Sequence, residues 1–237
     1  MEKTAAQAAD TSVYVVVAAL NEARSIAGVV GSLRELDLPL TVVVVDDGSS
    51  DGTSAIAREA GAVVLRHIFN MGQGAGLQTG IQFAVSQGAA FIVTFDADGQ
   101  HEAADIPVML DVARTKGCDV VLGSRFLGKA IGMKKGRERL LRMATALTNA
   151  MTGLELTDTH NGFRLLSRHA AASIRIRQNG MAHASEILHQ IKKHGLSWSE
   201  APVTIRYSDY SMAKGQSNLS GFGILLDIFL RRLVGGD

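Results

Sequence analysis

The stretch FIVTFDADGQH, residues 91–101, decides how the rest of the chain is interpreted. Residues 91–95 are mostly apolar, which is typical of a strand that is covered on both faces in a parallel sheet. Two carboxylates, Asp96 and Asp98, follow at the carboxyl end of this strand. In open α/β sheets ligands bind in the crevice beyond the carboxyl ends of the strands. The stretch therefore predicts acids that point into a binding crevice.

The first half of the chain alternates apolar runs with segments of helical spacing. Strands are expected at 12–20, 40–45, 62–65, 91–95 and 119–123, and helices at 21–36, 54–60, 76–87 and 106–116. This alternation predicts βαβ units, and hence an α/β domain with a mostly parallel central sheet flanked by helices. The second half is less regular, with helices expected at 140–154 and 221–234 and a strand at 203–207.

Composition excludes several classes of protein. The formal net charge of +1 and the low aromatic content give no footprint for nucleic acid. Cys118 is the only cysteine, so a disulfide framework is excluded and a buried, inert thiol is expected. The N-terminus lacks the layout of a signal peptide, and no apolar run approaches the ~20 residues of a membrane span. A cytoplasmic location is therefore expected.

The spacing of Asp96 and Asp98 suits a hard cation. Two carboxylates at i and i+2 can bend toward one Mg²⁺ or Mn²⁺, which is usually held by one or two carboxylates and by substrate phosphates. The alternative is a simple turn, because Asp and Gly are common in turns. A second acidic stretch, VVVVDDGSSDGT at 42–53, supports the ligand interpretation, because capping and turn formation do not explain its doubled Asp.

Six stretches follow one another along the chain: VAALNE, VVDDGSSDGT, NMGQGAG, FDADGQH, GSRF and DTHNGFRLLS. In this order they resemble the family-2 glycosyltransferases, whose single domain has the Rossmann-like GT-A fold. The resemblance is greatest to the polyprenyl-phosphate branch, which includes dolichol-phosphate mannosyltransferase. It extends over roughly residues 12–220.

The resemblance implies a role for particular positions of this chain. Asp98, Arg125 and Glu186 would be catalytic, with Arg125 binding a phosphate and Glu186 where many inverting enzymes of this fold place a carboxylate. Asp96, Asp98 and Gln100 would hold Mg²⁺ or Mn²⁺ and the diphosphate. Contacts to the nucleotide-sugar would come from Ala18, Leu20, Glu22, Val45, Asp47, Asp96, Ala97 and Lys214.

The chain departs from the family pattern in two places. Ala18 and Leu20 stand where the first motif usually carries Pro and Tyr. Met212 and Asn218 stand at positions of a late loop that are often basic in the polyprenyl branch, and Lys214 is close enough in sequence to compensate. These differences bear on the acceptor more than on the donor.

The activity implied is inverting, metal-dependent transfer of a sugar from a nucleotide diphospho-sugar to a polyprenyl phosphate or a lipid-linked glycan. A lipid phosphate with a second pKa of about 6 is largely a dianion at neutral pH and needs no strong base. A sugar hydroxyl would need a general base, for which Glu186 is the candidate. The alternatives are a nucleotidyltransferase, which would carry a glycine-rich loop after its first strand, and a non-catalytic nucleotide-sugar-binding partner subunit.

The single domain 1–237 is expected to consist of three parts. Residues 12–125 would bind the nucleotide-sugar, 126–220 the acceptor, and 221–237 would form a C-terminal amphipathic helix. Residues 125–142 carry seven bases against one acid, which favours a phosphate site over a solvated helix face. The last helix could pack on the core, join a homodimer or lie on an anionic membrane, so peripheral contact at the inner face of the cytoplasmic membrane stays open.

Overall fold

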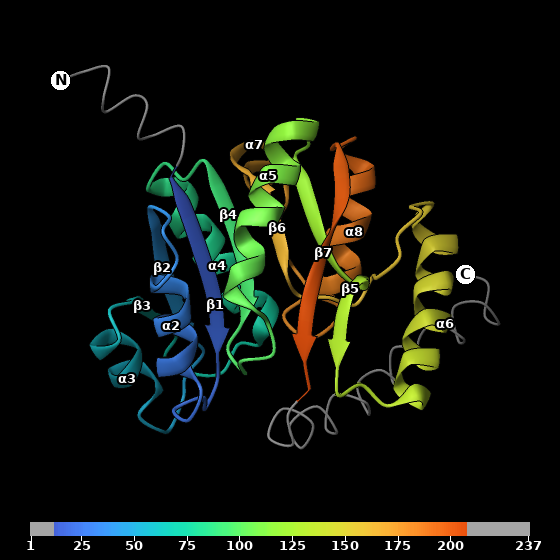
Figure 1. The fold of residues 1–237 in the computed structure, drawn as a ribbon. Helices are drawn as coiled ribbons and strands as arrows, with labels where there is room; N and C mark the ends of the chain where they lie inside the picture. Colours follow the sequence, from blue (N-terminus) through green and yellow to red (C-terminus); the bar gives the residue numbers. More distant parts are fainter. Residues whose placement is uncertain (1–11, 208–237) are drawn as a thin grey trace.

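The structure is a computed structural model, and it describes residues 12–207. Its centre is a seven-stranded sheet in the order β3-β2-β1-β4-β6-β5-β7 (Figure 1). The strands are β1 Val13–Ala19, β2 Leu40–Asp46, β3 Val63–Arg66, β4 Phe91–Asp96, β5 Val120–Ile131, β6 Arg164–Ser167 and β7 Trp198–Arg206. All neighbouring strands pair in parallel except β6, which is antiparallel to both β4 and β5. The expected α/β fold with a mostly parallel sheet is confirmed.

Helices cover both faces of this sheet. They are α2 Ile26–Arg34, α3 Thr53–Glu59, α4 Gln73–Ser86, α5 Ile106–Lys116, α6 Lys135–Thr152, α7 Arg168–Ser173 and α8 His183–Lys193, with a 3-10 turn η1 Ala103–Asp105. One apolar core joins α2 and α5 to the sheet face that is turned toward the viewer in Figure 1. The other core joins α4, α7 and α8 to the opposite face.

The start of α2 differs from the expected helix at 21–36. The helix begins at Ile26 because the backbone before it serves the neighbouring loop. The amide of Asn21 donates to Ser49 Oγ over 2.9 Å, and the amide of Glu22 donates to Thr53 Oγ1 over 2.8 Å. Asn21 also has a φ of 53°, a left-handed conformation that a helix cannot contain.

The second half of the fold contains elements that the sequence did not predict. β5 runs on to Ile131 because it pairs in parallel with β7, with an irregular register between Ser124 and Lys129. The strand expected at 203–207 begins already at Trp198. β6, α7 and α8 were not expected. β6 has four residues and α7 six, too short for a periodic pattern, whereas α8 has eleven residues and was overlooked.

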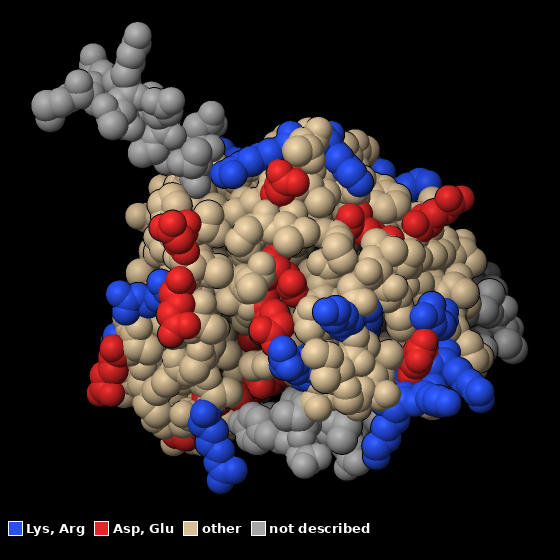
Figure 2. Space-filling model, viewed as in Figure 1, with Lys and Arg blue, Asp and Glu red and all other residues tan. Residues whose placement is uncertain are grey.

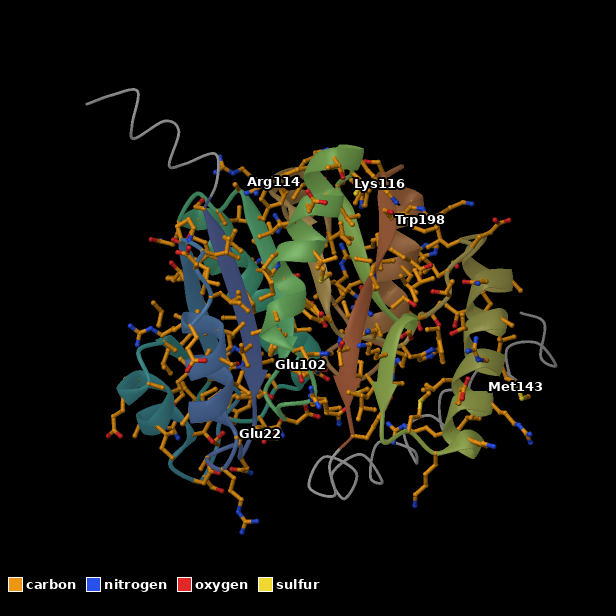
Figure 3. The ribbon with its side chains drawn as sticks, in the orientation of Figure 1. Glu22, Glu102, Arg114, Lys116, Met143 and Trp198 are labelled. Carbon is orange, nitrogen blue, oxygen red and sulfur yellow. The ribbon has the colours of Figure 1, made fainter. Side chains whose placement is uncertain are left out.

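The direction of the strands places the predicted site residues together. β1, β2, β4 and β5 all run toward the lower edge of the sheet in Figure 1. The antiparallel β6 begins near that edge, with Arg164 opposite Thr94 of β4. Figure 3 shows Glu22 and Glu102 toward this edge, whereas Arg114, Lys116 and Trp198 lie toward the opposite one.

Three further predictions concern Cys118, the C-terminal helix and a membrane span. Cys118 is buried as expected, and burial raises the pKa of its thiol. The helix expected at 221–234 lies outside the described residues, as do Met212, Lys214 and Asn218. Among residues 12–207 no helix is long and apolar enough to cross a membrane.

Helix α4 packs directly on the sheet through a glycine, which gives a first prediction. A Cβ at Gly80 would collide with Val16 and come within 3.1 Å of Val45 Cγ2. Gly80→Ala should therefore lower the free energy of unfolding by about 1–3 kcal/mol, as overpacking does. Gly31→Ala in α2 is the matched control, because a Cβ there meets nothing within 4 Å.

The control substitution should raise stability by up to about 1 kcal/mol, because glycine weakens a helix interior. Denaturant melts of the two variants measure both effects. Equal stabilities for the two variants would show that α4 does not approach β1 as closely as described.

Candidate active site

A cavity of about 570 Å³ opens at the carboxyl edge of the sheet. Its walls come from both halves of the fold, and Asp47, Asp98 and Arg125 all line it. The carboxylates that were expected to converge on one crevice therefore do so.

The carboxylate of Asp46 holds loop 46–53 in shape through hydrogen bonds to Ser49 and Ser54. Asp46 is fully buried and accepts from the amide of Ser49 over 2.8 Å and from the hydroxyl of Ser54. Burial acts to raise the pKa of Asp46, but these bonds outweigh it and hold the pKa below its ordinary value. The first Asp of the pair thus fixes the loop.

Asp47, the second Asp of the pair, fixes the following loop. Its carboxylate accepts from the amide of Met71 over 2.9 Å and of Gly72 over 2.7 Å. His67 Nδ1 lies 2.7 Å from the same carboxylate, and its Nε2 lies 2.9 Å from Thr79 Oγ1. Because Asp47 still lines the cavity, the shape of loop 67–72 and any ligand at Asp47 depend on the same carboxylate.

Asp96 is oriented from two sides. His101 Nε2 lies 2.9 Å from its Oδ2, and Gln73 Nε2 donates to its Oδ1 over 3.2 Å. Burial acts to raise the pKa of Asp96, but His101, His183 and Arg164 together hold the pKa below its ordinary value. A Cβ at Gly162 would lie 2.9 Å from Asp96 Oδ1, which explains the glycine there.

Asp98 is in the opposite electrostatic situation. Its pKa is raised to about 6, first by burial and then by the negative charge of Asp96. The Oδ1 atom of Asp98 accepts a hydrogen bond from the amide of Gln100 over 3.0 Å. This bond acts to lower the pKa of Asp98, but it offsets only part of the rise. The negative charge of Asp96 therefore opposes the ionisation of Asp98.

The donor set fits a divalent cation that shares its ligands with a substrate. Asp96, Asp98 and Gln100 offer oxygen atoms at the same cavity, and Mg²⁺ or Mn²⁺ prefers oxygen. Among residues 12–207 no group of three or more His, Cys, Asp or Glu side chains could hold a metal by itself. These three residues would leave coordination positions open, and Mg²⁺ commonly fills such positions with water and substrate phosphates.

Arg125 lies on the other side of the cavity and is firmly held. Its Nε donates to Asp158 Oδ2 over 2.6 Å, its Nη1 to Tyr207 Oη over 2.6 Å, and its Nη2 to the carbonyl of His160 over 2.8 Å. Burial acts to lower the pKa of Arg125, but the charge of Asp158 outweighs it and raises the pKa. The guanidinium is thus a fixed, permanent cation.

The remaining predicted residues differ in their relation to the cavity. Those that line it are Ala18, Leu20, Glu22, Ala97 and Gln100. Val45 is fully buried in the core against α4 and does not line the cavity, so its side chain is not available to a nucleotide. Glu186 does not line it either, because its carboxylate accepts from the amides of Arg177 and Gln178.

Other residues of the cavity were missed at the sequence level. Asn161 and Arg164 belong to the NGFR stretch, and His183 begins α8. Only Arg137 of the basic residues between 129 and 142 lines the cavity. Figure 2 shows Lys and Arg gathered at the lower right, where α6 lies in Figure 1. The motif NGFR was a signal for Asn161 and Arg164, whereas nothing in the sequence marked His183.

Comparison with known proteins identifies the family. The sequence model of the family described as Glycosyl transferase family 2 matches residues 14–175 of this chain. An uncharacterized protein of Methanocaldococcus jannaschii is 35% identical over 93% of this chain and 92% of its own length. A UDP-N-acetylglucosamine–dolichyl-phosphate N-acetylglucosaminyltransferase of Methanococcus voltae is 30% identical over 95% of this chain and 98% of its own. An undecaprenyl-phosphate mannosyltransferase of Micrococcus luteus is 27% identical, with 88% of each chain covered.

Among solved structures, glucosyl-3-phosphoglycerate synthase from Mycobacterium tuberculosis has the same fold. Its complex with Mn²⁺, UDP-glucose and phosphoglyceric acid superposes with a TM-score of 0.68 at 20% identity, over 90% of this chain and 78% of that one. A second structure of the same enzyme holds Mg²⁺ and UDP. At this identity the likeness shows the GT-A fold alone.

The raised pKa of Asp98 predicts how a neutral replacement affects the metal-free protein. Ionised Asp98 costs stability above pH 6, and this cost disappears as the pH falls from about 6 toward the ordinary value of 3.8. Asp98→Asn should therefore raise the melting temperature in EDTA at pH 7.5, by about 2–4 °C for each kcal/mol relieved. The gain should vanish near pH 4.

Asp111→Asn is the control, since Asp111 is exposed on α5, and this variant should show no such gain at either pH. A lower melting temperature for Asp98→Asn at pH 7.5 would contradict the electrostatic description of the site.

Proposed function

Because this glycosyltransferase belongs to glycosyl transferase family 2, we propose that it transfers a sugar, with inversion, from a nucleotide diphospho-sugar to a polyprenyl phosphate. One observation carries the proposal: a single cavity joins an acidic half, which suits a cation-bound diphosphate, to a basic and apolar half. Asp96 and Asp98 form the first half. Arg125, Arg137 and the apolar Leu140 and Leu141 form the second.

The donor would occupy the acidic half. Ala18, Leu20 and Asp47 line the part of the cavity nearest β1 and β2, where the nucleoside would lie. Mg²⁺ or Mn²⁺ held by Asp96, Asp98 and Gln100 would neutralise charge on the leaving diphosphate. Support comes from the Mycobacterium tuberculosis enzyme, whose structures hold UDP with either metal.

The acceptor would enter from the side of α6. Arg125 is fixed by Asp158, Tyr207 and the His160 carbonyl, so it would present a charge whose position does not depend on the ligand. Leu140 and Leu141 would cover the first part of an isoprenoid chain, and Arg137 lies beside them. The names of the relatives from Methanococcus voltae and Micrococcus luteus, which specify dolichyl and undecaprenyl phosphates, support this acceptor class.

The reaction would need little acid–base chemistry from the protein. The dianionic phosphate of the acceptor is itself the nucleophile, attacking the anomeric carbon from the face opposite the diphosphate. The transition state would carry oxocarbenium character, as in glycoside hydrolysis. Residues of this chain then act by holding two phosphate groups in line rather than by moving protons.

The alternative acceptor, a sugar hydroxyl with Glu186 as base, finds less support. The Glu186 carboxylate accepts from the Arg177 amide over 2.9 Å and lies outside the cavity lining. A non-catalytic partner subunit is disfavoured because both acids and Arg125 are present at one cavity.

A lipid acceptor also supports peripheral contact with the cytoplasmic membrane. Helix α6 and the preceding strand end expose Leu127, Ile131 and Met143 among basic residues, and Met143 stands out from α6 in Figure 3. Such a mixture suits the surface of an anionic bilayer. A homodimer remains a prediction from the sequence.

Donor binding can be tested by thermal shift with nucleoside diphosphates and Mn²⁺. A ligand present at a hundredfold excess over its Kd should stabilise the wild type by about 2.7 kcal/mol. Asp98→Ala should lose the part of this shift that depends on Mn²⁺, whereas Asp111→Ala, at an exposed acid of α5, should keep it. No shift with UDP, GDP or dTDP in the wild type would exclude the donor class.

Acceptor class can be tested with Glu186→Gln, whose amide oxygen can still accept from the backbone at 177 and 178. With a polyprenyl phosphate acceptor, this variant should keep transfer within about threefold of the wild type, because no base is needed. Transfer to the corresponding polyprenol should be absent in both proteins. A loss of about a hundredfold or more in Glu186→Gln, the effect expected when a general base is removed, would favour the hydroxyl mechanism instead.

A further inference from the structure

Buried donors without acceptors gather at the cavity. Within residues 12–207, five buried side-chain nitrogens have no hydrogen-bond partner, and four belong to residues that line the cavity. Three of these four can only donate or stay unused: Arg137 Nε, Asn161 Nδ2 and Arg164 Nη1. Buried polar groups in proteins are normally paired, so such a cluster indicates a missing acceptor-rich group.

Asn161 is locked in the orientation that leaves a donor free. Its Oδ1 accepts from the amide of Phe163 over 3.1 Å, so the other end of its side chain must be the NH₂ group. The residue is 4% exposed. Asn161 lines the cavity, and its Nδ2 is a buried donor without an acceptor.

Arg164 is the buried cation beside it. It begins β6 directly opposite Thr94 of β4 and Leu122 of β5, so its side chain lies on the same face of the sheet as theirs. It is 2% exposed, and no carboxylate of residues 12–207 forms an ion pair with it within 4.0 Å. Arg125, by contrast, donates to three partners through its side chain.

The groups that face Arg164 do not neutralise it fully. Burial lowers its pKa to about 10, against which the charges of Asp96 and Asp158 act only in part. His160 and His183 also face it, and the pKa of each is lowered first by burial, so both are neutral at pH 7. Arg164 stays charged at neutral pH, and a buried charge without a close partner is costly.

We propose that Asn161 and Arg164 form a subsite that donates to the phosphoryl oxygens of a substrate bound in the cavity. An uncharged hydroxyl would leave the guanidinium charge uncompensated, whereas a phosphate supplies both charge and several acceptors. The inference rests on the proposed function, because the phosphate belongs either to the donor diphosphate or to the acceptor monophosphate. The charges of Asp96, on the donor side, and of Asp158, the partner of Arg125 on the acceptor side, both act on Arg164.

Two variants test the subsite. Asn161→Asp keeps the shape and the oxygen that accepts from Phe163 but replaces the free donor by an acceptor. Arg164→Lys keeps the charge but loses the planar fork of donors. Arg168→Gln is the control, because Arg168 follows the same strand but donates to the carbonyls of Ala89 and Gly88 away from the cavity.

Binding is measured by calorimetry with two pairs of probes in the presence of Mn²⁺. One pair is UDP and uridine, replaced by GDP and guanosine if only GDP stabilises the wild type. The other pair is farnesyl phosphate and farnesol. Each pair differs only in its phosphate, so the difference in affinity within a pair isolates the phosphate contact.

The proposal expects one phosphate probe to bind both variants about tenfold to a hundredfold more weakly than the wild type, with its phosphate-free partner unchanged. Loss for the nucleoside diphosphate assigns the subsite to the donor, and loss for farnesyl phosphate assigns it to the acceptor. Arg168→Gln should bind all probes as the wild type does.

Asn161→Asp is informative if it melts within a few degrees of the wild type. The inference is overturned if this variant binds both phosphate probes as tightly as the wild type does. It is also overturned if the affinity for each phosphate-free probe falls as much as that for its phosphate partner. Arg164→Lys serves in the same way if Asn161→Asp does not fold. A wild type that binds neither phosphate would instead refute the proposed function.

Discussion

The repulsion between Asp96 and Asp98 is the constraint on which the rest of the site depends. β4 delivers both carboxylates to one cavity, one residue apart, and the surroundings divide their roles. His101, His183 and Arg164 keep Asp96 ionised, whereas burial and its neighbour raise the pKa of Asp98 to about 6. A cation bound at this pair, as we propose, would relieve the cost of ionising Asp98, and ligands from the substrate would then favour its binding.

The antiparallel strand β6 explains how cations reach the same cavity. A sheet of parallel strands alone presents strand ends at its carboxyl edge, here the acidic loops after β1, β2 and β4. By running the other way, β6 begins at that edge and places Arg164 between β4 and β5. The loop before it supplies Asp158, which fixes Arg125. The reversed strand thus adds a cation, Arg164, at the edge where the parallel strands place their acidic loops.

The sequence predicted the parallel half well, because local patterns determine it. Long apolar runs such as 40–45 ended at acidic turns, and the alternation of strands and helices placed those turns at one edge. It failed where long-range pairing decides. β6 has only four residues. Glu186 falls where many inverting enzymes of this fold place a carboxylate, yet here its carboxylate accepts from the amides of Arg177 and Gln178. Val45 followed from the same resemblance, but its side chain faces α4 in the core.

The central claim is that two protein carboxylates hold a divalent cation jointly with the substrate. Titration of Mn²⁺, followed by electron paramagnetic resonance with and without a saturating nucleoside diphosphate, tests this most directly. The account predicts weak binding of Mn²⁺ alone and affinity higher by about tenfold or more with the nucleotide, with the same factor when the titration order is reversed. Tight Mn²⁺ binding that is indifferent to the nucleotide would contradict it.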